Sequence, residues 1–162
     1  MWLGTHKHGV AIYHPDTKRI TCIGDDKDGS LDILCFYEDT DGKIWIGTQS
    51  GLYSAYNREL TQEDKINRLL TNKGIRSILR DKNGKLWIGA KGLFLFDDKG
   101  QLFQELTTEQ SFPIRSVNYL MEDSRKRIWV GTNDGILVFR DASHLEDYSH
   151  YGTKEGLQNT NV

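Results

Sequence analysis

Short apolar runs alternate with polar turns that contain glycine along almost the whole chain. Runs such as 75–80, 85–90 and 92–96 are rich in Ile, Leu and aromatic residues. Such runs, bounded by Gly, Asn and Asp, are typical of β-strands, because branched and aromatic side chains suit a pleated surface. No segment keeps an apolar period of 3.6 residues over the length of an ordinary helix. One stretch, 61–70, is a candidate for a single short helix in a connecting loop.

The four tryptophans mark an internal repeat. Each opens a tetrapeptide of Trp, an apolar residue, Gly and a small residue, and successive tryptophans lie 43, 42 and 42 residues apart. An aspartate stands six residues before each of the last three tryptophans. The repeated residues are Trp2, Trp45, Trp87 and Trp129, then Gly4, Gly47, Gly89 and Gly131, and then Asp39, Asp81 and Asp123.

Each repeat contains the signals for four short strands. Asp41-Gly42 and Asn83-Gly84 favour a two-residue hairpin turn, because these residues tolerate the positive φ that such a turn needs. We therefore expect 75–81 and 85–90 to pair antiparallel. A glycine at 51, 92 or 135 then turns the chain into a third strand. Turns at 15–18 and 98–100 lead into a fourth strand, at 19–23 and 101–106.

Four short strands in about 42 residues are the unit of a β-propeller blade. Helical HEAT and armadillo repeats have similar lengths, but Gly and Asn-Gly recur here where a helix would need continuous turns. We predict an all-β propeller fragment of four-stranded antiparallel blades, about four in number, with incomplete ends. The blade repeats are expected at about 1–30, 31–72, 73–114 and 115–156, and 157–162 would start a further repeat.

The repeated residues are expected to be scaffold. A Trp at the same place in every repeat should pack between adjacent sheets, and its Gly should let the neighbouring sheet approach closely. The aspartates should bond to backbone in the turns, as Asp commonly does. Function is therefore expected where the repeats differ.

The repeat pattern resembles that of the two-component regulator propeller family. It reads Ile/Val-x-x-Ile/Leu-x-x-Asp, Asn/Asp-Gly-Lys, Leu/Ile-Trp-Ile-Gly-Thr and Gly-Leu-x-x-Tyr/Phe, and 154–162 resembles the lead-in of a next repeat. The resemblance implies a periplasmic propeller of a bacterial hybrid sensor kinase, placed before a small β-sandwich, a membrane span, and cytoplasmic kinase and regulator modules. It also implies that the propellers help to sense glycan fragments and contribute to dimeric signalling.

By the same resemblance the innermost strands fall at 33–38, 75–80 and 117–122. The chain starts at a Trp strand and stops where the innermost strand of a fifth blade would begin. We expect three whole blades and one without its innermost strand, as in a segment of a larger propeller or the product of a truncated gene. Open ends expose apolar faces and strand edges, which favour association. Self-association is therefore expected. One arrangement would be a homodimer in which two chains build a pseudo-ring of eight blades.

Composition narrows the possible functions. The 162 residues include 21 Lys and Arg against 23 Asp and Glu, a net charge of −2 that argues against generic nucleic-acid binding. No apolar run approaches the roughly 20 residues that span a bilayer, so we expect no direct membrane contact from this chain. Cys22 and Cys35 are the only cysteines, and both are expected to be small buried hydrophobic residues.

No catalytic motif is present. The chain lacks a Gly-x-Ser-x-Gly elbow, a phosphate-binding glycine loop with Lys, and His-Glu-x-x-His. His6 and His8 lack a third metal ligand at suitable spacing, so no metal or cofactor is expected. Asp26-x-Asp28-Gly29 and Asp39-x-Asp41-Gly42 echo the start of a calcium loop without the rest of it, and hairpin turns are favoured there.

The remaining candidates are loop residues that share one face of a propeller. Loops carry binding residues disproportionately often, and basic, amide and imidazole groups can bind acidic or hydroxyl-rich sugars. We interpret the chain as a non-enzymatic, ligand-sensing segment of a two-component sensor, with glycan-derived ligands. The alternatives are a protein-interaction scaffold that supplies a dimerisation surface and, third, a propeller lyase or hydrolase. The candidate ligand-binding residues are His6, His8, Gln49, Lys91, Arg115 and Asn133.

Overall fold

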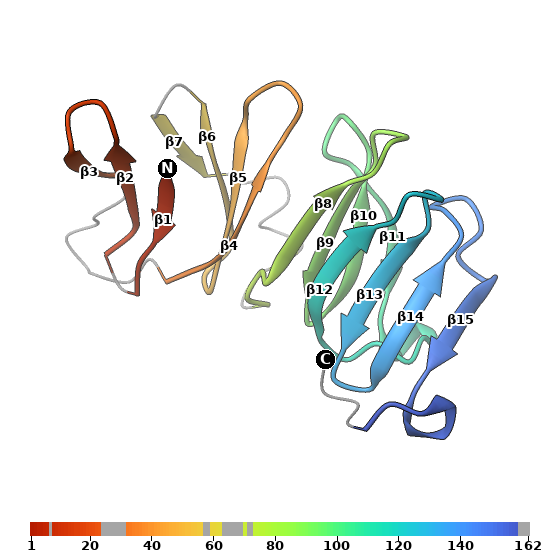
Figure 1. The fold of residues 1–162 in the computed structure, drawn as a ribbon. Coiled ribbons are helices and arrows are strands. Elements are labelled where there is room, and N and C mark those ends of the chain that lie inside the picture. Colours follow the sequence, from red (N-terminus) through yellow and green to blue (C-terminus); the bar gives the residue numbers. More distant parts are fainter. Residues whose placement is uncertain (7, 24–31, 57–58, 63–69, 71–72, 159–162) are drawn as a thin grey trace. The chain divides into compact units, whose positions relative to one another are not determined.

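The predicted all-β class is confirmed. The structure, a computed structural model, describes residues 1–6, 8–23, 32–56, 59–62, 70 and 73–158. The first sheet holds β1 (Trp2–Gly4), β2 (Val10–His14) and β3 (Arg19–Ile23), and the second holds β4 (Ile33–Glu38), β5 (Ile44–Thr48), β6 (Leu52–Tyr56) and β7 (Glu59–Gln62). The third holds β8 (Ser77–Arg80), β9 (Leu86–Ala90), β10 (Gly92–Phe96) and β11 (Leu102–Leu106), and the fourth holds β12 (Val117–Glu122), β13 (Ile128–Thr132), β14 (Gly135–Phe139) and β15 (Tyr148–Tyr151) (Figure 1). Two short 3-10 helices, η1 (Thr108–Gln110) and η2 (Thr153–Glu155), follow the third and fourth sheets.

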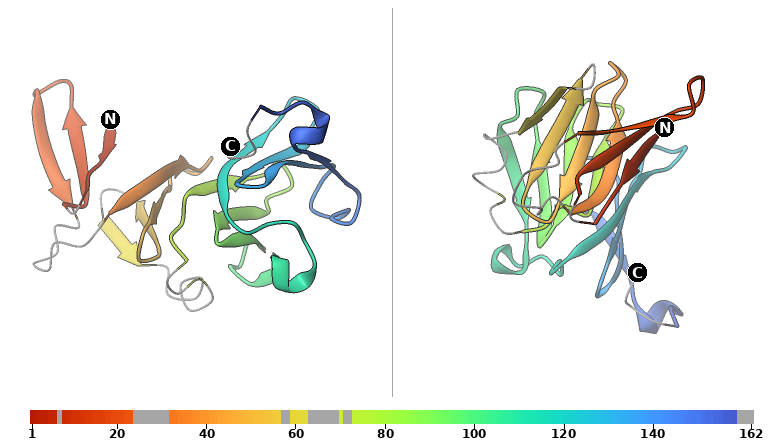
Figure 2. Two further views of the ribbon diagram at one scale, coloured as in Figure 1. Left: turned by 90° about the horizontal axis from the view of Figure 1, so that it is seen from below. Right: turned by 90° about the vertical axis from the view of Figure 1, so that its left-hand side faces the viewer.

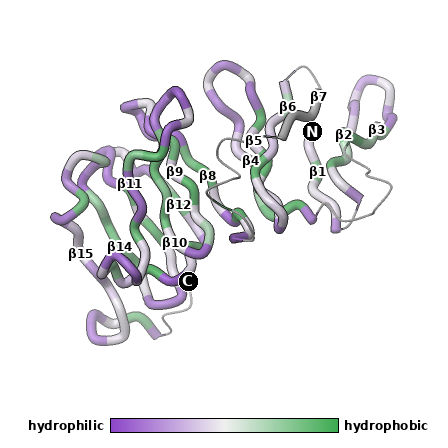
Figure 3. The backbone as a smooth tube through the Cα atoms, turned by 180° about the vertical axis from the view of Figure 1, so that it is seen from behind, coloured by the Kyte–Doolittle hydropathy of each residue, from purple (hydrophilic) through white to green (hydrophobic). Residues whose placement is uncertain are grey.

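Every sheet is an antiparallel meander in which sequence neighbours pair. The three complete sheets run from the strand before the Trp strand to a fourth, last strand, whereas the first sheet begins with the Trp strand itself. Figure 2 shows the same hairpins from two further sides, and Figure 3 shows polar turns at the ends of more apolar strands. The repeat inferred from sequence therefore corresponds to one sheet per repeat.

The hairpin turns at Asp41-Gly42 and Asn83-Gly84 differ from the expected two-residue turn. Asp81 N donates to Lys85 O at 2.9 Å, and Gly84 N donates to Asp81 O at 2.9 Å. Three residues therefore lie between the paired positions, and of these only Gly84 has a positive φ, of 82°. This is a type I turn closed by a residue in the left-handed conformation. The physical reason is the Asp81 side chain, which binds the amides of the turn as described below.

Three further expectations need correction. Thr61 and Gln62 belong to β7, so the start of the expected short helix is a strand, and 63–69 lie outside the described residues. The inner strand expected from residue 75 begins at Ser77, because Ile75 N instead donates to Thr48 O in the preceding sheet at 2.9 Å. Cys22 is exposed, because it lies on β3, the outermost strand of the first sheet. The Asp26-x-Asp28-Gly29 segment lies outside the described residues.

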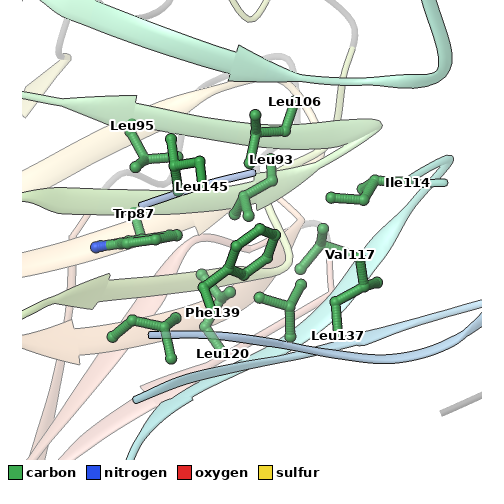
Figure 4. Close-up of a cluster of buried hydrophobic side chains, with 12 residues drawn as sticks. Trp87, Leu93, Leu95, Leu106, Ile114, Val117, Leu120, Leu137, Phe139 and Leu145 are labelled. Atoms are coloured by element: carbon green, nitrogen blue, oxygen red, sulfur yellow. The ribbon is translucent and has the colours of Figure 1, made fainter. Parts of the chain in front are cut away.

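The chain forms two compact units, Met1–Ile75 and Arg76–Val162, each with its own apolar cluster. In the first unit Val10 and Ile12 of β2 pack with Ile44 and Ile46 of β5. In the second unit Trp87 and Leu95 of the third sheet pack with side chains of the fourth, as Figure 4 shows. The Trp87 and Phe139 ring centroids are 6.1 Å apart. Trp87 thus packs between adjacent sheets, as its periodic position predicts.

The glycine two residues after Trp allows close packing of sheets within each unit. A Cβ built on Gly89 would lie 2.5 Å from Cγ1 of Val117 on the next sheet. A Cβ built on Gly4 would lie 2.8 Å from Cγ2 of Ile33, again on the next sheet. Both distances are shorter than any side chain tolerates, so only glycine fits without movement of the neighbouring sheet.

Candidate functional site

Four candidate residues occupy one equivalent position in the repeat. His6, Gln49, Lys91 and Asn133 lie in the turn after the Trp strand, and they are spaced by 43, 42 and 42 residues, like the tryptophans. All four are exposed. The repeated scaffold thus presents four different polar side chains at the same place, one from each sheet.

A threonine side chain shapes three of these turns. Thr48 Oγ1 accepts a hydrogen bond from Gly51 N at 2.9 Å and donates to Gly51 O at 2.8 Å. Thr132 Oγ1 donates to Gly135 O at 2.9 Å, and Thr5 Oγ1 donates to Gly9 O at 2.6 Å. Sequence reasoning did not assign this role, although the signal was present in the repeated Thr after Trp-x-Gly. In the third repeat Ala90 takes the place of this threonine.

The first unit brings two candidates together through Asp32. His6 Nδ1 lies 2.8 Å from Asp32 Oδ1, and the backbone oxygen of Asp32 accepts from Gln49 N at 3.1 Å. The amide of Gln49 also lies over Gly74, since a Cβ built there would be 3.1 Å from Gln49 Oε1. Asp32, just before the innermost strand β4, was not among the candidates from the sequence. His8 lies exposed two residues beyond His6 in the same turn.

In the second unit Asn133 is held by a neighbouring strand. Asn118 Nδ2 of β12 donates to Asn133 Oδ1 at 2.8 Å. His150 of β15 lies with Nε2 3.0 Å from the backbone oxygen of Asp134, the next residue of the same turn. Lys91 and Arg115 are both exposed, Lys91 between β9 and β10 and Arg115 before β12. Three of the six candidates therefore lie in each unit, and among the described residues contacts join only His6 and Gln49, through Asp32.

The repeated aspartates lie at the opposite ends of the Trp strands, where each accepts from its own Trp. The indole Nε1 of Trp45, Trp87 and Trp129 donates to Oδ2 of Asp39, Asp81 and Asp123 at 2.9, 2.7 and 3.0 Å. Asp81 Oδ1 also accepts from Asn83 N and Lys85 N, both at 2.9 Å. The backbone bonds were expected from the sequence, whereas the bond from the indole was not. Each carboxylate is thus occupied in closing a turn.

Three of the described titratable groups have shifted pKa values with structural causes, and a hydrogen bond with His144 is the main reason that the pKa of Asp141 is lowered. The hydrogen bond from Trp129 is the main reason that the pKa of Asp123 lies well below its usual range, and bonds from Arg127 act in the same direction. Burial raises the pKa of Cys35 to about 12. The Cys35 thiol donates to Ile75 O at 3.6 Å and stays protonated at neutral pH, so it is a poor nucleophile.

The described residues contain no group of three or more His, Cys, Asp or Glu that could hold a metal ion. The described part of the chain also has no helix long and apolar enough to cross a membrane.

Antiparallel sheets that recur about every 42 residues, with Trp faces that pack on the following sheet inside each unit, define a run of β-propeller blades. Residues 29–50, 69–92 and 111–134 match the two component regulator propeller family. The chain therefore carries repeats of that family. No curated protein matches the chain significantly.

Solved structures with the same fold include extracellular sensor domains. The extracellular domain of the hybrid two component system BT3049 from B. thetaiotaomicron is 30% identical, with a TM-score of 0.87, over 99% of this chain and 22% of that one. The extracellular domain of the one component system BT4673 from B. thetaiotaomicron is 23% identical, with a TM-score of 0.76, over 99% of this chain and 22% of that one. This chain thus spans about a fifth of the length of these two structures.

A lyase shares the fold at lower identity. Virginiamycin B lyase from Staphylococcus aureus is 14% identical, with a TM-score of 0.70, over 93% of this chain and 51% of that one. Identity at this level shows a common propeller fold alone.

The family match and the 30% identity to the BT3049 domain together show a propeller segment like those in the extracellular regions of two-component sensors.

Proposed function

We propose that the chain is a non-enzymatic, ligand-sensing segment of a periplasmic propeller in a two-component sensor, and that its ligands are glycan-derived. One observation carries the proposal: a repeated scaffold presents His6, Gln49, Lys91 and Asn133 at one equivalent, exposed turn position. A scaffold that keeps its buried residues and varies its exposed turn residues is suited to recognition.

The chemistry of these turns favours hydroxyl-rich and acidic ligands. Amide groups of Gln49 and Asn133 can both donate and accept hydrogen bonds, as sugar hydroxyls require. The Lys91 ammonium would form charge-assisted hydrogen bonds with a carboxylate or sulfate on a sugar. Binding would then bias the packing of neighbouring blades or protomers, and domains outside this chain would transmit the change.

A glycan array with the protein in its natural length tests the proposal. We expect binding to a subset of acidic oligosaccharides, and Lys91→Ala should weaken it about tenfold or more in titration calorimetry, as loss of a charge-assisted bond implies. Lys99→Ala is the matched control, because Lys99 is also exposed but lies in the β10–β11 turn at the other end of the sheet. The proposal fails if no glycan binds, or if both variants weaken binding equally.

A scaffold function is the second candidate, and exposed large apolar side chains such as those of Tyr56 and Phe103 favour it. It predicts association that no small ligand alters. The lyase reading rests on the propeller fold alone, with His6 and His8 as the available general bases. If a streptogramin or polysaccharide lyase assay shows turnover that His6→Ala with His8→Ala abolishes, the non-enzymatic proposal is wrong.

A further inference from the structure

The turn between β8 and β9 contains the only Asn-Gly pair in the sequence. Asn83 is exposed, and a Cβ built on Gly84 would meet no atom of the described chain within 4 Å beyond its own neighbours. Such a pair is chemically reactive, because the amide nitrogen of the following residue can attack the side-chain carbonyl carbon of the Asn. A glycine at the following position has no side chain to hinder that approach, and its backbone is the least restricted of all residues.

The folded turn restrains this reaction. Gly84 N, the atom that would attack, donates to Asp81 O at 2.9 Å. Asn83 N donates to Asp81 Oδ1 at 2.9 Å, and Nη1 of Arg80 donates to Gly84 O at 2.9 Å. The peptide groups on both sides of Gly84 are therefore held by neighbouring residues. The Gly84 amide has to leave Asp81 O before it can close a ring with the Asn83 side chain, so the turn has to open locally first.

We propose that Asn83 is a site of spontaneous covalent modification, and that opening of the β8–β9 turn controls its rate. The Gly84 nitrogen forms a bond to Asn83 Cγ and gives up its proton, and the side-chain nitrogen leaves as ammonia. Water then opens the resulting cyclic imide at either of its two carbonyl carbons. One opening gives an aspartate at position 83, and the other gives an isoaspartate, whose backbone runs through the side-chain carbons. Water is the only co-reactant, and no group is oxidised or reduced.

The second repeat already contains the aspartate form of this turn. It has Asp41 and Gly42 at the equivalent positions, and Gly42 N donates to Asp39 O at 3.0 Å. Asp41 Oδ1 accepts from Lys43 N at 2.9 Å, so a carboxylate at this position fits the turn. An isoaspartate would instead add one methylene carbon to the backbone between the two paired strands. That change would disrupt the hydrogen bonds that close the turn, so only the isoaspartate product should destabilise the fold.

Peptide mapping by mass spectrometry tests this proposal, which does not depend on any ligand. The protein in its natural length is incubated at neutral pH, in buffer and in guanidinium chloride that unfolds it, and conversion of Asn83 is followed in both. We expect conversion to be at least about tenfold faster in the denaturant, because the unfolded chain lacks the bond from Gly84 N to Asp81 O. Asn133 is the internal control, since it is also exposed in a turn but is followed by Asp134. In the denaturant it should convert at least about tenfold more slowly than Asn83, because its neighbour has a side chain.

A pair of variants tests whether the turn controls the rate. Asp81→Ala removes the bonds that Asp81 Oδ1 accepts within the turn, so conversion of Asn83 in buffer should become several-fold faster. Asp97→Ala is the matched control, because Asp97 Oδ1 also accepts from two amides, in a turn that contains no Asn, and it should leave the rate unchanged. If circular dichroism shows that Asp81→Ala has lost its fold, Arg80→Ala replaces it, since this variant removes the bond to Gly84 O.

The two products are distinguished by their effect on unfolding. Asn83→Asp supplies the aspartate product in pure form, and its midpoint of urea unfolding should match that of the natural chain. A sample enriched in isoaspartate at position 83 should unfold at a lower urea concentration. The proposal is overturned if Asn83 does not convert in the denaturant, if it converts as fast in buffer, if Asn133 converts equally fast, or if Asp81→Ala and Asp97→Ala behave alike.

Discussion

At the scale of residues, the bond between each repeated aspartate and its tryptophan is the most informative detail. At Asp81, one carboxylate oxygen accepts from two turn amides and the other accepts from a buried indole N–H. Buried polar groups without partners are costly, so this geometry ties the turn to the core. The sequence showed the spacing of six residues between Asp and Trp but not the bond, because spacing alone does not reveal that the side chains point toward each other.

Asp81→Asn tests this bond. The amide oxygen of Asn can replace Oδ1 in the turn, but its NH₂ group would then face the Trp87 N–H, donor against donor. We expect a loss of about 1–3 kcal/mol in the free energy of unfolding, measured by urea denaturation. Asp97→Asn is the control, since Asp97 Oδ1 accepts from Lys99 N and Gln101 N in a similar turn and no Trp precedes or follows it closely. It should cost less than about 0.5 kcal/mol.

Acid should weaken the fold through Asp123. Its pKa in the folded chain lies below the value of about 3.9 expected when unfolded, so the stabilisation is complete above that pH and is lost as pH falls below it. We expect the free energy of unfolding to decrease below about pH 4, and Asp123→Asn should flatten this decrease. Trp129→Phe, which removes the main cause of the shift, should flatten it in part. An unchanged pH profile in both variants would contradict this reading.

At the scale of elements, periodicity was sufficient to predict strands and their pairing. The strand at 19–23 was predicted at its observed bounds from its position after a turn, whereas the strands at 33–38 and 117–122 were predicted at their observed bounds from the family resemblance. The start of β8 was missed because the backbone of Ile75 bonds to another sheet, which is a long-range effect. The turn type was missed because a side chain, not the Asp-Gly or Asn-Gly pair alone, selects it.

Gly89→Ala tests how closely the third and fourth sheets pack. A methyl group would lie 2.5 Å from Val117 Cγ1, and overpacking of a core typically costs about 1–3 kcal/mol. Val117→Ala in the same chain should recover part of that cost, which a double-mutant cycle in urea measures. Gly152→Ala is the control, since its φ is −125° and a Cβ there meets only Glu155 Oε2 at 3.5 Å. Equal losses at both glycines would contradict the close approach.

At the scale of the whole molecule, the four sheets are not equally protected. β9 is buried along its whole length, whereas four of the five residues of β3 are exposed and the strand pairs on one side only. The candidate site was predicted only in part. The sequence placed its residues on equivalent turns but could not show that His6 and Gln49 both contact Asp32. Contacts between repeats depend on sheet packing, which periodicity does not specify.

Hydrogen exchange should show this gradient. In the dilute full chain, amides of β3 should exchange at least about 100-fold faster than those of β9, because local opening of an exposed edge strand needs far less free energy than exposure of the core. Mass spectrometry of exchanged peptides measures both strands in one sample. Equal protection of β3 and β9 would contradict the gradient.

The closing bond from Trp to Asp spans only six residues, so it is inherited whole whenever a repeat is copied. A duplicated segment of about 42 residues would bring its own turn, its own hydrogen bond between Trp and Asp, and both faces through which the sheets pack. A gene could therefore lengthen or shorten such an array by unequal recombination without first acquiring compensating substitutions inside a hairpin. Selection would then act mainly on the exposed turn position, where His, Gln, Lys and Asn already differ among the four copies.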